Sequence, residues 1–220
     1  MPKGRSKSRS QRRRLTLHIG NVGEHSFSPA ELARWRRHPT PGDVLGPFYR
    51  KGAPFRSDLS PPSAKGMPLV ISGTVRGVGA RKPLANAVLD LWQANADGHY
   101  DNDDPAHPPP QDVYIDRARL KTDKRGRYQF RTVYPGPYKM DVTTWRTPHL
   151  HYKVRAAGYR TLVTQLFFRD APYLATDPFV KKALIIALKA KQGDRGPYWT
   201  GTFNVVLARH KRSKRSNNKR

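Results

Sequence analysis

Residues 85–92 read Ala-Asn-Ala-Val-Leu-Asp-Leu-Trp, and their alternation indicates the fold class. Successive side chains of an extended chain point to opposite sides, so every second residue shares a face. One face of this stretch is wholly apolar and the other is mixed. The apolar face consists of Ala85, Ala87, Leu89 and Leu91, and the mixed face of Asn86, Val88, Asp90 and Trp92. A period of two predicts a β-strand that buries its apolar face in a core.

Comparable runs recur along the chain from residue 67 onward. They cover residues 68–78, 127–133, 149–154, 161–168 and 201–207. Turn signals rich in Gly, Pro and Asp separate them, at 77–79, 97–98, 123–126 and 135–136. Many short strands with regular turns predict an all-β protein in the form of a β-sandwich.

Two helices and one long loop are predicted around these runs. Residues 28–37 begin with Ser-Pro-Ala-Glu, a pattern that caps a helix N-terminus. Residues 40–66 are rich in Pro and Gly, which is typical of an ordered loop. The second helix is expected over 178–191, with Asp177 as its cap and an apolar stripe of Val180, Ala183, Leu184, Ala187 and Leu188.

The charge is strongly basic and unevenly distributed. The 220 residues include 42 Lys and Arg against 16 Asp and Glu, a formal net charge of +26. Residues 1–14 and 209–220 hold 14 of the basic residues and no acidic one. Such segments lack the apolar surface needed to fold, so disordered basic tails that bind polyanions weakly are expected. No aromatic residue is interleaved there to stack on single-stranded nucleic acid.

The absence of cysteine excludes disulfide scaffolds, thiolate metal sites and cysteine nucleophiles. Any metal must therefore be held by nitrogen and oxygen ligands. No run of about 18 apolar residues is present, which argues against a membrane span. The first 20 residues lack the apolar core of a secretory signal, so a cytoplasmic protein with one domain is expected.

His149 and His151 form the first sharp feature of the sequence. Residues i and i+2 of a strand share a face, so the two imidazoles can converge on one point. Tyr138 ends a turn-like Tyr-Pro-Gly-Pro-Tyr stretch, and Tyr100 ends an Asn-Ala-Asp-Gly-His-Tyr stretch. Two imidazoles and two phenolates suit a hard trivalent cation, above all Fe(III). By spacing alone, two ordinary histidines and two sandwich tyrosines remain the alternative.

Other candidate ligands are set aside. His99 neighbours Tyr100, so on an extended chain its side chain would point away from a site that includes that tyrosine. The acidic stretch with Asp101, Asp103 and Asp104 lacks the spacing of a calcium loop and is interpreted as a solvated loop.

The chain resembles the intradiol ring-cleavage dioxygenase family, which includes protocatechuate 3,4-dioxygenases and catechol 1,2-dioxygenases. The resemblance runs in order from residue 46 to residue 207. Its segments are GPFYR (46–50), LDLWQANADGHYDN (89–102), TDKRGRYQFRTVYPGPY (122–138), WRTPHLHYKV (145–154), GYRTLVTQLFF (158–168) and TFNVVL (202–207).

This resemblance implies a transthyretin-like β-sandwich with short helices and long loops, and a non-haem Fe(III) cofactor. It implies Tyr100 and Tyr138 as equatorial and axial tyrosinates. It implies His149 and His151 as axial and equatorial imidazoles. Arg146 matches an active-site arginine, Gln165 a glutamine beside the substrate ring, and Pro47 and Tyr49 a pocket-lining loop. On their own, these four residues also fit a surface ion pair, a structural hydrogen bond and loop packing.

The resemblance also implies the reaction. A catecholic ring would be cleaved with O2 between its two hydroxyl-bearing carbons, giving a muconate-type diacid. Tyr138 would leave the metal and take up a proton, while Arg146 would stabilise negative charge on the ring. The expected organisation is a tail over 1–14, an extension with one short helix over 15–45, a catalytic domain over 46–208 and a tail over 209–220.

Three departures bear on the substrate and on partners. Only 45 residues precede Gly46, which favours a protocatechuate-like enzyme, and such enzymes pair with a homologous chain. Met140 stands where a tryptophan is frequent, and the stretch between Tyr138 and Arg146 is short. The substrate is thus a protocatechuate-like or substituted catechol, and a homo-oligomer or a homologous partner chain is expected. The alternative function is a polyanion- or RNA-binding protein that uses the tails on a β-sandwich scaffold.

Overall fold

The computed structural model describes residues 38–80 and 82–210 of the chain. Their regular structure is almost entirely β-strand, so the all-β prediction is confirmed. In the described ranges, no helix is long and apolar enough to cross a membrane. The elements are β1 (Pro68–Gly77), β2 (Val88–Gln93), β3 (Arg117–Lys121), β4 (Arg127–Val133), β5 (Tyr138–Lys139), β6 (Trp145–Arg146), β7 (His149–Arg155), β8 (Leu162–Phe168), the 3-10 helix η1 (Lys182–Leu184), β9 (Ile185–Ile186), β10 (Lys189–Gly193), β11 (Gly196–Thr202) and β12 (Val205–Leu207).

Some predictions fall on parts of the chain that are not described. The predicted helix over 28–37, the tail over 1–14 and nearly all of the tail over 209–220 lie outside the described residues. The polyanion-binding alternative depends on these tails, and it stays a prediction.

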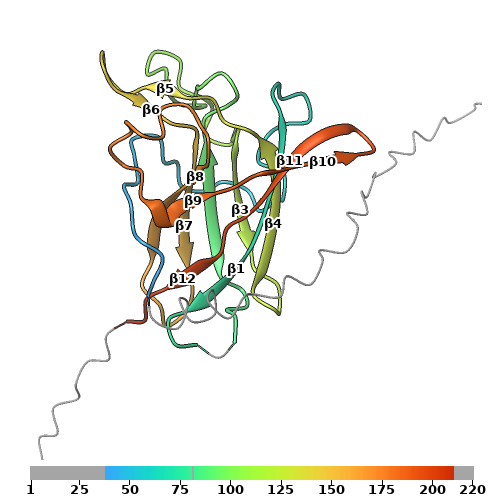
Figure 1. Cartoon of the computed structure of the whole chain (residues 1–220), viewed down its shortest axis with the longest axis vertical. Coiled ribbons are helices and arrows are strands. Elements are labelled where there is room, and N and C mark those ends of the chain that lie inside the picture. Colours follow the sequence, from blue (N-terminus) through green and yellow to red (C-terminus); the bar gives the residue numbers. More distant parts are fainter. Residues whose placement is uncertain (1–37, 81, 211–220) are drawn as a thin grey trace, which may run out of the picture.

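Two five-stranded sheets form a sandwich, and a small hairpin of β5 and β6 lies at one end of it (Figure 1). One sheet contains β10, β11, β1, β12 and β4, and β10 pairs with β11. Strands β11 and β12 pair with successive parts of one edge of β1, and β4 pairs with its other edge. The second sheet has the order β3-β2-β7-β8-β9. Strand β7 is therefore hydrogen-bonded on both edges, to β2 and β8.

The core lies between the sheets and follows the period of two predicted for residues 85–92. Ala87, Leu89 and Leu91 are fully or almost fully buried in it. Ala85 is exposed, because the chain turns at Asn86, whose φ is 56°, and the strand begins only at Val88. Burial of such apolar side chains contributes about 1.5–3 kcal/mol each.

The opposite face of the second sheet carries polar and aromatic side chains that are also buried. Trp92, His151 and Gln165 are paired across β2, β7 and β8 in a single row. Each is at most 1% exposed. Since alternate residues of these strands face the core, this row lies on the outer face of the sheet, where a covering segment must exclude water.

The long loop predicted over 40–66 covers part of this face, and the prediction is confirmed because no strand or helix interrupts it. Its beginning is fixed to both sheets by backbone hydrogen bonds, from Thr40 to Val206 of β12 and from Asp43 to Val163 of β8. The hydroxyl of Thr164 donates to the carbonyl of Pro41 at 2.8 Å.

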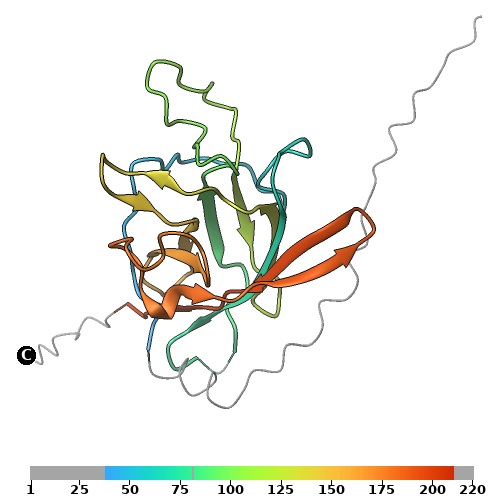
Figure 2. The same cartoon turned by 45° about the horizontal axis from the view of Figure 1, so that its top comes forward.

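The helix predicted over 178–191 is wrong. The segment forms the 3-10 helix η1 and the strands β9 and β10 instead, and β10 pairs with β11 in a hairpin that projects from the body (Figure 2). Ile186 and Leu188, which share a face in an extended chain, approach Gly201, where a side chain would collide with both. Ala183 and Ala187 of the predicted stripe are exposed. Burial at period two outweighed the helical pattern, because Gly201 leaves room for these alternate side chains.

Candidate metal centre

The two histidines lie on β7 and point to the same place. Their Nε2 atoms are 3.1 Å apart, and both side chains are almost completely buried. The Nδ1 atom of His149 lies 2.6 Å from the carbonyl oxygen of Thr147, a contact in which Nδ1 must carry the proton. The lone pair of His149 is therefore on Nε2, the tautomer that a metal ligand needs. The ring of His151 stacks on Trp92 at 4.8 Å with an interplanar angle of 4°.

The two tyrosines reach the same place from a loop, which carries Tyr100, and from the start of β5, which carries Tyr138. The hydroxyl of Tyr100 is 3.4 Å from Nε2 of His149. The ring of Tyr138 is 5.6 Å from the ring of Tyr100 and 5.7 Å from that of His149, measured between centroids. The structure thus brings together the four side chains that the sequence indicated.

Glycines in the two loops set the distance between the tyrosines. The amide of Gly136 donates to the carbonyl of Asn95 at 2.8 Å, which joins the loops through their backbones. A Cβ on Gly136 would lie 2.4 Å from the carbonyl oxygen of Ala96, and one on Gly98 would lie 2.3 Å from that of Pro137. Any larger residue would therefore push the loops apart.

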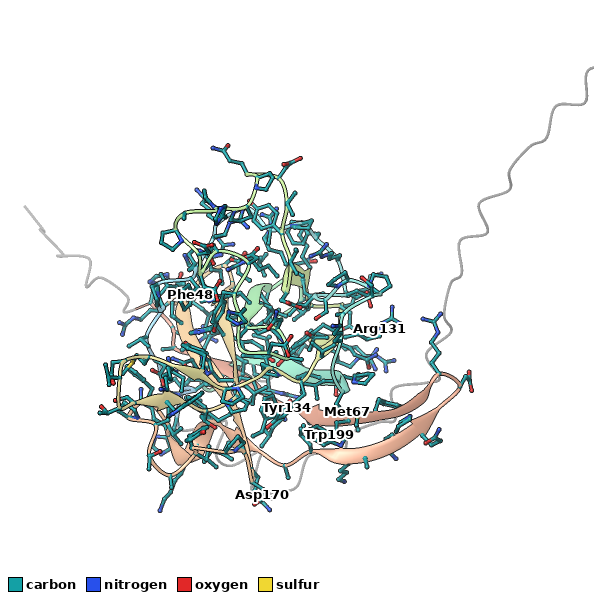
Figure 3. All side chains as sticks on the ribbon, turned by 90° about the horizontal axis from the view of Figure 1, so that it is seen from above. Phe48, Met67, Arg131, Tyr134, Asp170 and Trp199 are labelled. Atoms are coloured by element: carbon teal, nitrogen blue, oxygen red, sulfur yellow. The ribbon has the colours of Figure 1, made fainter. Side chains whose placement is uncertain are left out.

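Figure 3 shows Tyr134, at the start of the turn that leads to Tyr138, beside Met67 and Trp199.

Burial shifts the pKa of all four side chains toward the neutral form. It raises the pKa of the Tyr100 phenol well above its usual value, and the neighbouring Tyr138 adds to the rise. Burial also raises the pKa of Tyr138, and the Arg146 guanidinium, which lowers this pKa, offsets part of the rise. Burial, with Arg146 nearby, lowers the pKa of His149 to about 3, and burial together with His149 lowers that of His151. A cation between them would favour the phenolates, because its charge stabilises them.

Arg146 lies on β6 at the edge of this cluster and is only 3% exposed. It donates from one terminal nitrogen to the Tyr138 hydroxyl at 3.4 Å and from the other to Oε1 of Gln165 at 2.5 Å. Its Nε donates to Asp177 at 2.9 Å, and the ring of Phe179 covers its face at 4.5 Å. The ion pair of Arg146 with Asp177 is therefore buried and does not lie on the surface. The side chain of Gln165 is directed toward Arg146.

The Gly-Pro-Phe-Tyr segment covers the cluster, although its residues do so unequally. Gly46 has a φ of 73°, and a Cβ on it would lie 3.3 Å from the His151 ring. Phe48, labelled in Figure 3, stacks on Tyr100 with ring centroids 4.3 Å apart. Tyr49 packs on Trp92 at 4.9 Å, behind the histidine pair. Pro47 is exposed, and its assignment to the pocket stays a prediction.

The interpretation of residues 101–104 as a solvated loop is wrong for Asp101. Its side chain is 1% exposed and accepts hydrogen bonds from Arg50 at 2.7 Å and from Arg117 at 2.6 Å. These two arginines neutralise the carboxylate, which would otherwise be too costly to bury. The side chain of His99 is 70% exposed and pairs with Asp103, which agrees with the expectation that it points away from the site.

The donor set fits a trivalent metal better than a divalent one. In the described residues, no group of three or more His, Cys, Asp or Glu side chains could hold a metal. A metal at this point must therefore use the phenol oxygens, which are hard anionic donors once deprotonated. Two donors that bind one ion through bonds of about 2.0–2.1 Å must lie within about 4 Å of each other. The observed separations of 3.1 Å and 3.4 Å agree with this.

Comparisons with known proteins point in the same direction. A 6-chlorohydroxyquinol 1,2-dioxygenase of Cupriavidus pinatubonensis is 40% identical over 149 residues, which are 61% of this chain and 52% of that protein. An intradiol ring-cleavage dioxygenase of Aspergillus niger is 29% identical over 189 residues, 77% of this chain and 59% of that protein. The family model described as Dioxygenase matches residues 44–209. The chain belongs to the intradiol ring-cleavage dioxygenase family.

A solved intradiol structure shares the fold. The 3-chlorocatechol 1,2-dioxygenase of Rhodococcus opacus 1CP superposes with a TM-score of 0.71 at 28% identity. The superposed region covers 82% of this chain and 77% of the Rhodococcus chain. The chain spans between half and three-fifths of the length of the Cupriavidus and Aspergillus relatives.

Several residues around this cluster were not singled out from the sequence. Asp177 was interpreted as a helix cap, and it does accept the amide of Phe179 at 2.9 Å, but no helix begins there. Phe48 lies within the Gly-Pro-Phe-Tyr-Arg segment that carried the family resemblance, so a signal for it existed. Trp92 could have been found by placing residues 85–92 beside the His149 strand, since it pairs with His151.

Proposed function

We propose that this chain is a non-haem Fe(III) dioxygenase that opens a catecholic ring between its two hydroxyl-bearing carbons and gives a muconate-type dicarboxylic acid. The observation that carries the proposal is the convergence of two buried imidazoles and two phenols beside a buried guanidinium. Family membership supports the reaction class. Tyr100, Tyr138, His149 and His151 would hold the ferric ion, which supplies Lewis acidity toward a chelating diol.

Tyr138 is the candidate proton acceptor. A catechol bound through both oxygens would release two protons, of which Tyr138 would take one and solvent the other. Burial raises the pKa of Tyr138, so a phenolate at this position is a stronger base than a free one and takes up a proton readily. Its hydroxyl is also within 3.4 Å of Arg146, which can stabilise the anion until protonation.

Arg146 is the candidate for stabilising negative charge on the ring carbon that oxygen attacks. A guanidinium remains protonated in a buried site, and its interaction with a developing charge is screened less there than in water. Gln165 accepts from Arg146 and thereby helps to orient it, while its own amide nitrogen donates to Asp43 at 3.5 Å. The covering residues Gly46, Phe48 and Tyr49 exclude water on the side of His151 and Tyr100.

The substrate is proposed to be a substituted catechol. Two of the relatives named above, those of Cupriavidus and Rhodococcus, act on a chlorinated triol or diol by their names, and Met140 and Val142 are exposed on the turn after β5. The reaction balances without a reductant, because the ring carbon–carbon bond breaks and each of its carbons receives one atom of O2. Assembly with a homologous chain or a second copy stays a prediction.

Oxygen uptake tests this proposal. Ferric-loaded protein is assayed with catechol, protocatechuate, hydroxyquinol and 3-chlorocatechol, and the products are identified after reaction with ¹⁸O2. The proposal expects one O2 consumed per diol and one ¹⁸O atom in each new carboxyl group. Tyr138→Phe should lower the rate by about 10²- to 10⁴-fold, the usual range for loss of a proton-transfer group. Iron-loaded protein that consumes no O2 with any of the four diols would contradict it.

A further inference from the structure

The carboxylate of Asp177 lies at the far side of Arg146 from Tyr138. Its side chain is fully buried, and both of its oxygens are engaged. Oδ2 accepts from Nε of Arg146 and from the amide of Thr147, each at 2.9 Å. Oδ1 accepts from the amide of Phe179 at 2.9 Å. The carboxylate is thus fixed by two backbone amides before the arginine is considered.

These contacts determine how the guanidinium is oriented. A guanidinium is planar, so holding Nε on one edge directs the two terminal nitrogens to the opposite side. There they reach the Tyr138 hydroxyl and Oε1 of Gln165. The ring of Phe179 covers the face of the same plane at 4.5 Å. Asp177 restrains rotation within the plane, and Phe179 restrains tilting out of it.

Two other carboxylates lie near the site, and neither is paired with Arg146. Asp101 pairs with Arg50 and Arg117, and Asp43 accepts from the amide of Gln165 at 3.5 Å and lies 3.4 Å from Lys181. In the described part of the chain, the ion pair of Arg146 is the one with Asp177. The same carboxylate also holds the amide of Thr147, whose carbonyl accepts the Nδ1 proton of His149.

We propose that Asp177 is a positioning residue, which acts through Arg146 and, with Phe179, aims its terminal nitrogens at Tyr138 and Gln165. This inference rests on the proposed function, because the aim of Arg146 affects turnover only if a ring is opened there. The segment that carries Asp177 and Phe179 is then part of the active site, although neither residue touches the four candidate ligands.

The first test compares Asp177→Asn with Asp90→Asn. Asp90 is a matched control: it is equally buried, it pairs with Arg155 at 2.8 Å, and it contacts none of the candidate ligands. Asp177→Asn should lower kcat per bound iron by about 10- to 100-fold, the range for residues that orient a ligand or catalytic group, with little change in KM. Asp90→Asn should leave kcat unchanged. An equal kcat in both variants and the unsubstituted protein would overturn the proposal.

A double-mutant cycle shows whether Asp177 acts through Arg146. In the Arg146→Ala background, Asp177→Asn should lower kcat no further, because the group that it positions is gone. Multiplicative losses in the double variant would mean that Asp177 acts by another route, which would also overturn the proposal.

A second readout does not depend on turnover. In the iron-free protein, the Nε–H of Arg146 should give a slowly exchanging ¹H–¹⁵N signal, which Asp177→Asn shifts and exposes to exchange, while Asp90→Asn does not. An unaltered signal in Asp177→Asn would contradict the positioning role even if the protein proved inactive toward diols. A protein with the expected signal but no ring cleavage would instead remove the proposed function. If Asp177→Asn does not fold, Phe179→Leu serves, since it keeps the ion pair and should produce a smaller loss of kcat.

Discussion

The histidine half and the tyrosine half of the candidate site reach similar precision by different means. His149 and His151 are on a strand that is hydrogen-bonded on both edges, so their separation follows from the period of the backbone. Tyr100 is on a loop and Tyr138 begins the two-residue strand β5, and the spacing of the segments that lead to them is set by the close contact of Gly98 and Gly136 with backbone carbonyls. The histidine half should therefore lose its metal only when a ligand is removed, whereas the tyrosine half should also lose it when a neighbouring glycine that is no ligand is replaced.

The largest effect is expected on the histidine side. His151→Ala removes one ligand from a strand that remains paired, so the fold should survive while ferric iron is no longer retained and ring cleavage is lost. Metal analysis after ferric loading and gel filtration measures this, with the exposed His99→Ala as the control that keeps its iron. Full iron retention by His151→Ala would contradict its assignment as a ligand.

A somewhat smaller effect is expected from Gly136→Ala, which changes no ligand. The added methyl group would lie 2.4 Å from the Ala96 carbonyl oxygen, so the two loops must move apart. Overpacking of this kind costs about 1–3 kcal/mol, and both thermal stability and the tyrosinate colour of the iron-loaded protein should fall. Gly42→Ala is the matched control, because its Cβ would meet its nearest neighbour at an ordinary 3.5 Å. If the two variants behave alike, the loops are not held by glycine contact.

The smallest effect is expected from Phe48→Leu. Its ring stacks on Tyr100 at 4.3 Å, as Trp92 does on His151 from the other half of the site. Loss of a stacked aromatic pair costs about 0.5–1.5 kcal/mol beyond the lost area, which corresponds to a fall in Tm of a few degrees. Iron content should stay the same. A larger fall in Tm in Phe48→Leu than in Gly136→Ala would contradict the expectation that the glycine contact matters more than the stacked ring.

The same contrast explains what could be predicted from the sequence. The alternation in residues 85–92 and the spacing of His149 and His151 are local patterns, and both the sandwich and the convergence of the imidazoles followed from them. Strand β3 was not predicted, because it contains Arg117 and Arg119, which read as exposed. In the structure Arg117 is buried against Asp101, a partner that sequence distance conceals.

The roles of Asp177 and Asp101 could not be predicted for a related physical reason. Each carboxylate is buried by an arginine that reaches it only in the folded chain. A sequence shows an aspartate before Pro178 or in an acidic stretch, and such patterns are typical of caps and solvated loops. The error over residues 178–191 has the same origin, since Gly201 of β11 leaves the space that Ile186 and Leu188 fill.

The most direct test of the four-ligand site is a ferric titration followed by visible absorption. Tyrosinate bound to Fe(III) gives a charge-transfer band, which should rise linearly and saturate at one iron per chain. In the double variant Tyr100→Phe, Tyr138→Phe, where the histidine pair is intact, the band should be absent. A wild-type protein that stays colourless through the titration, or a double variant with an unchanged band, would contradict the account.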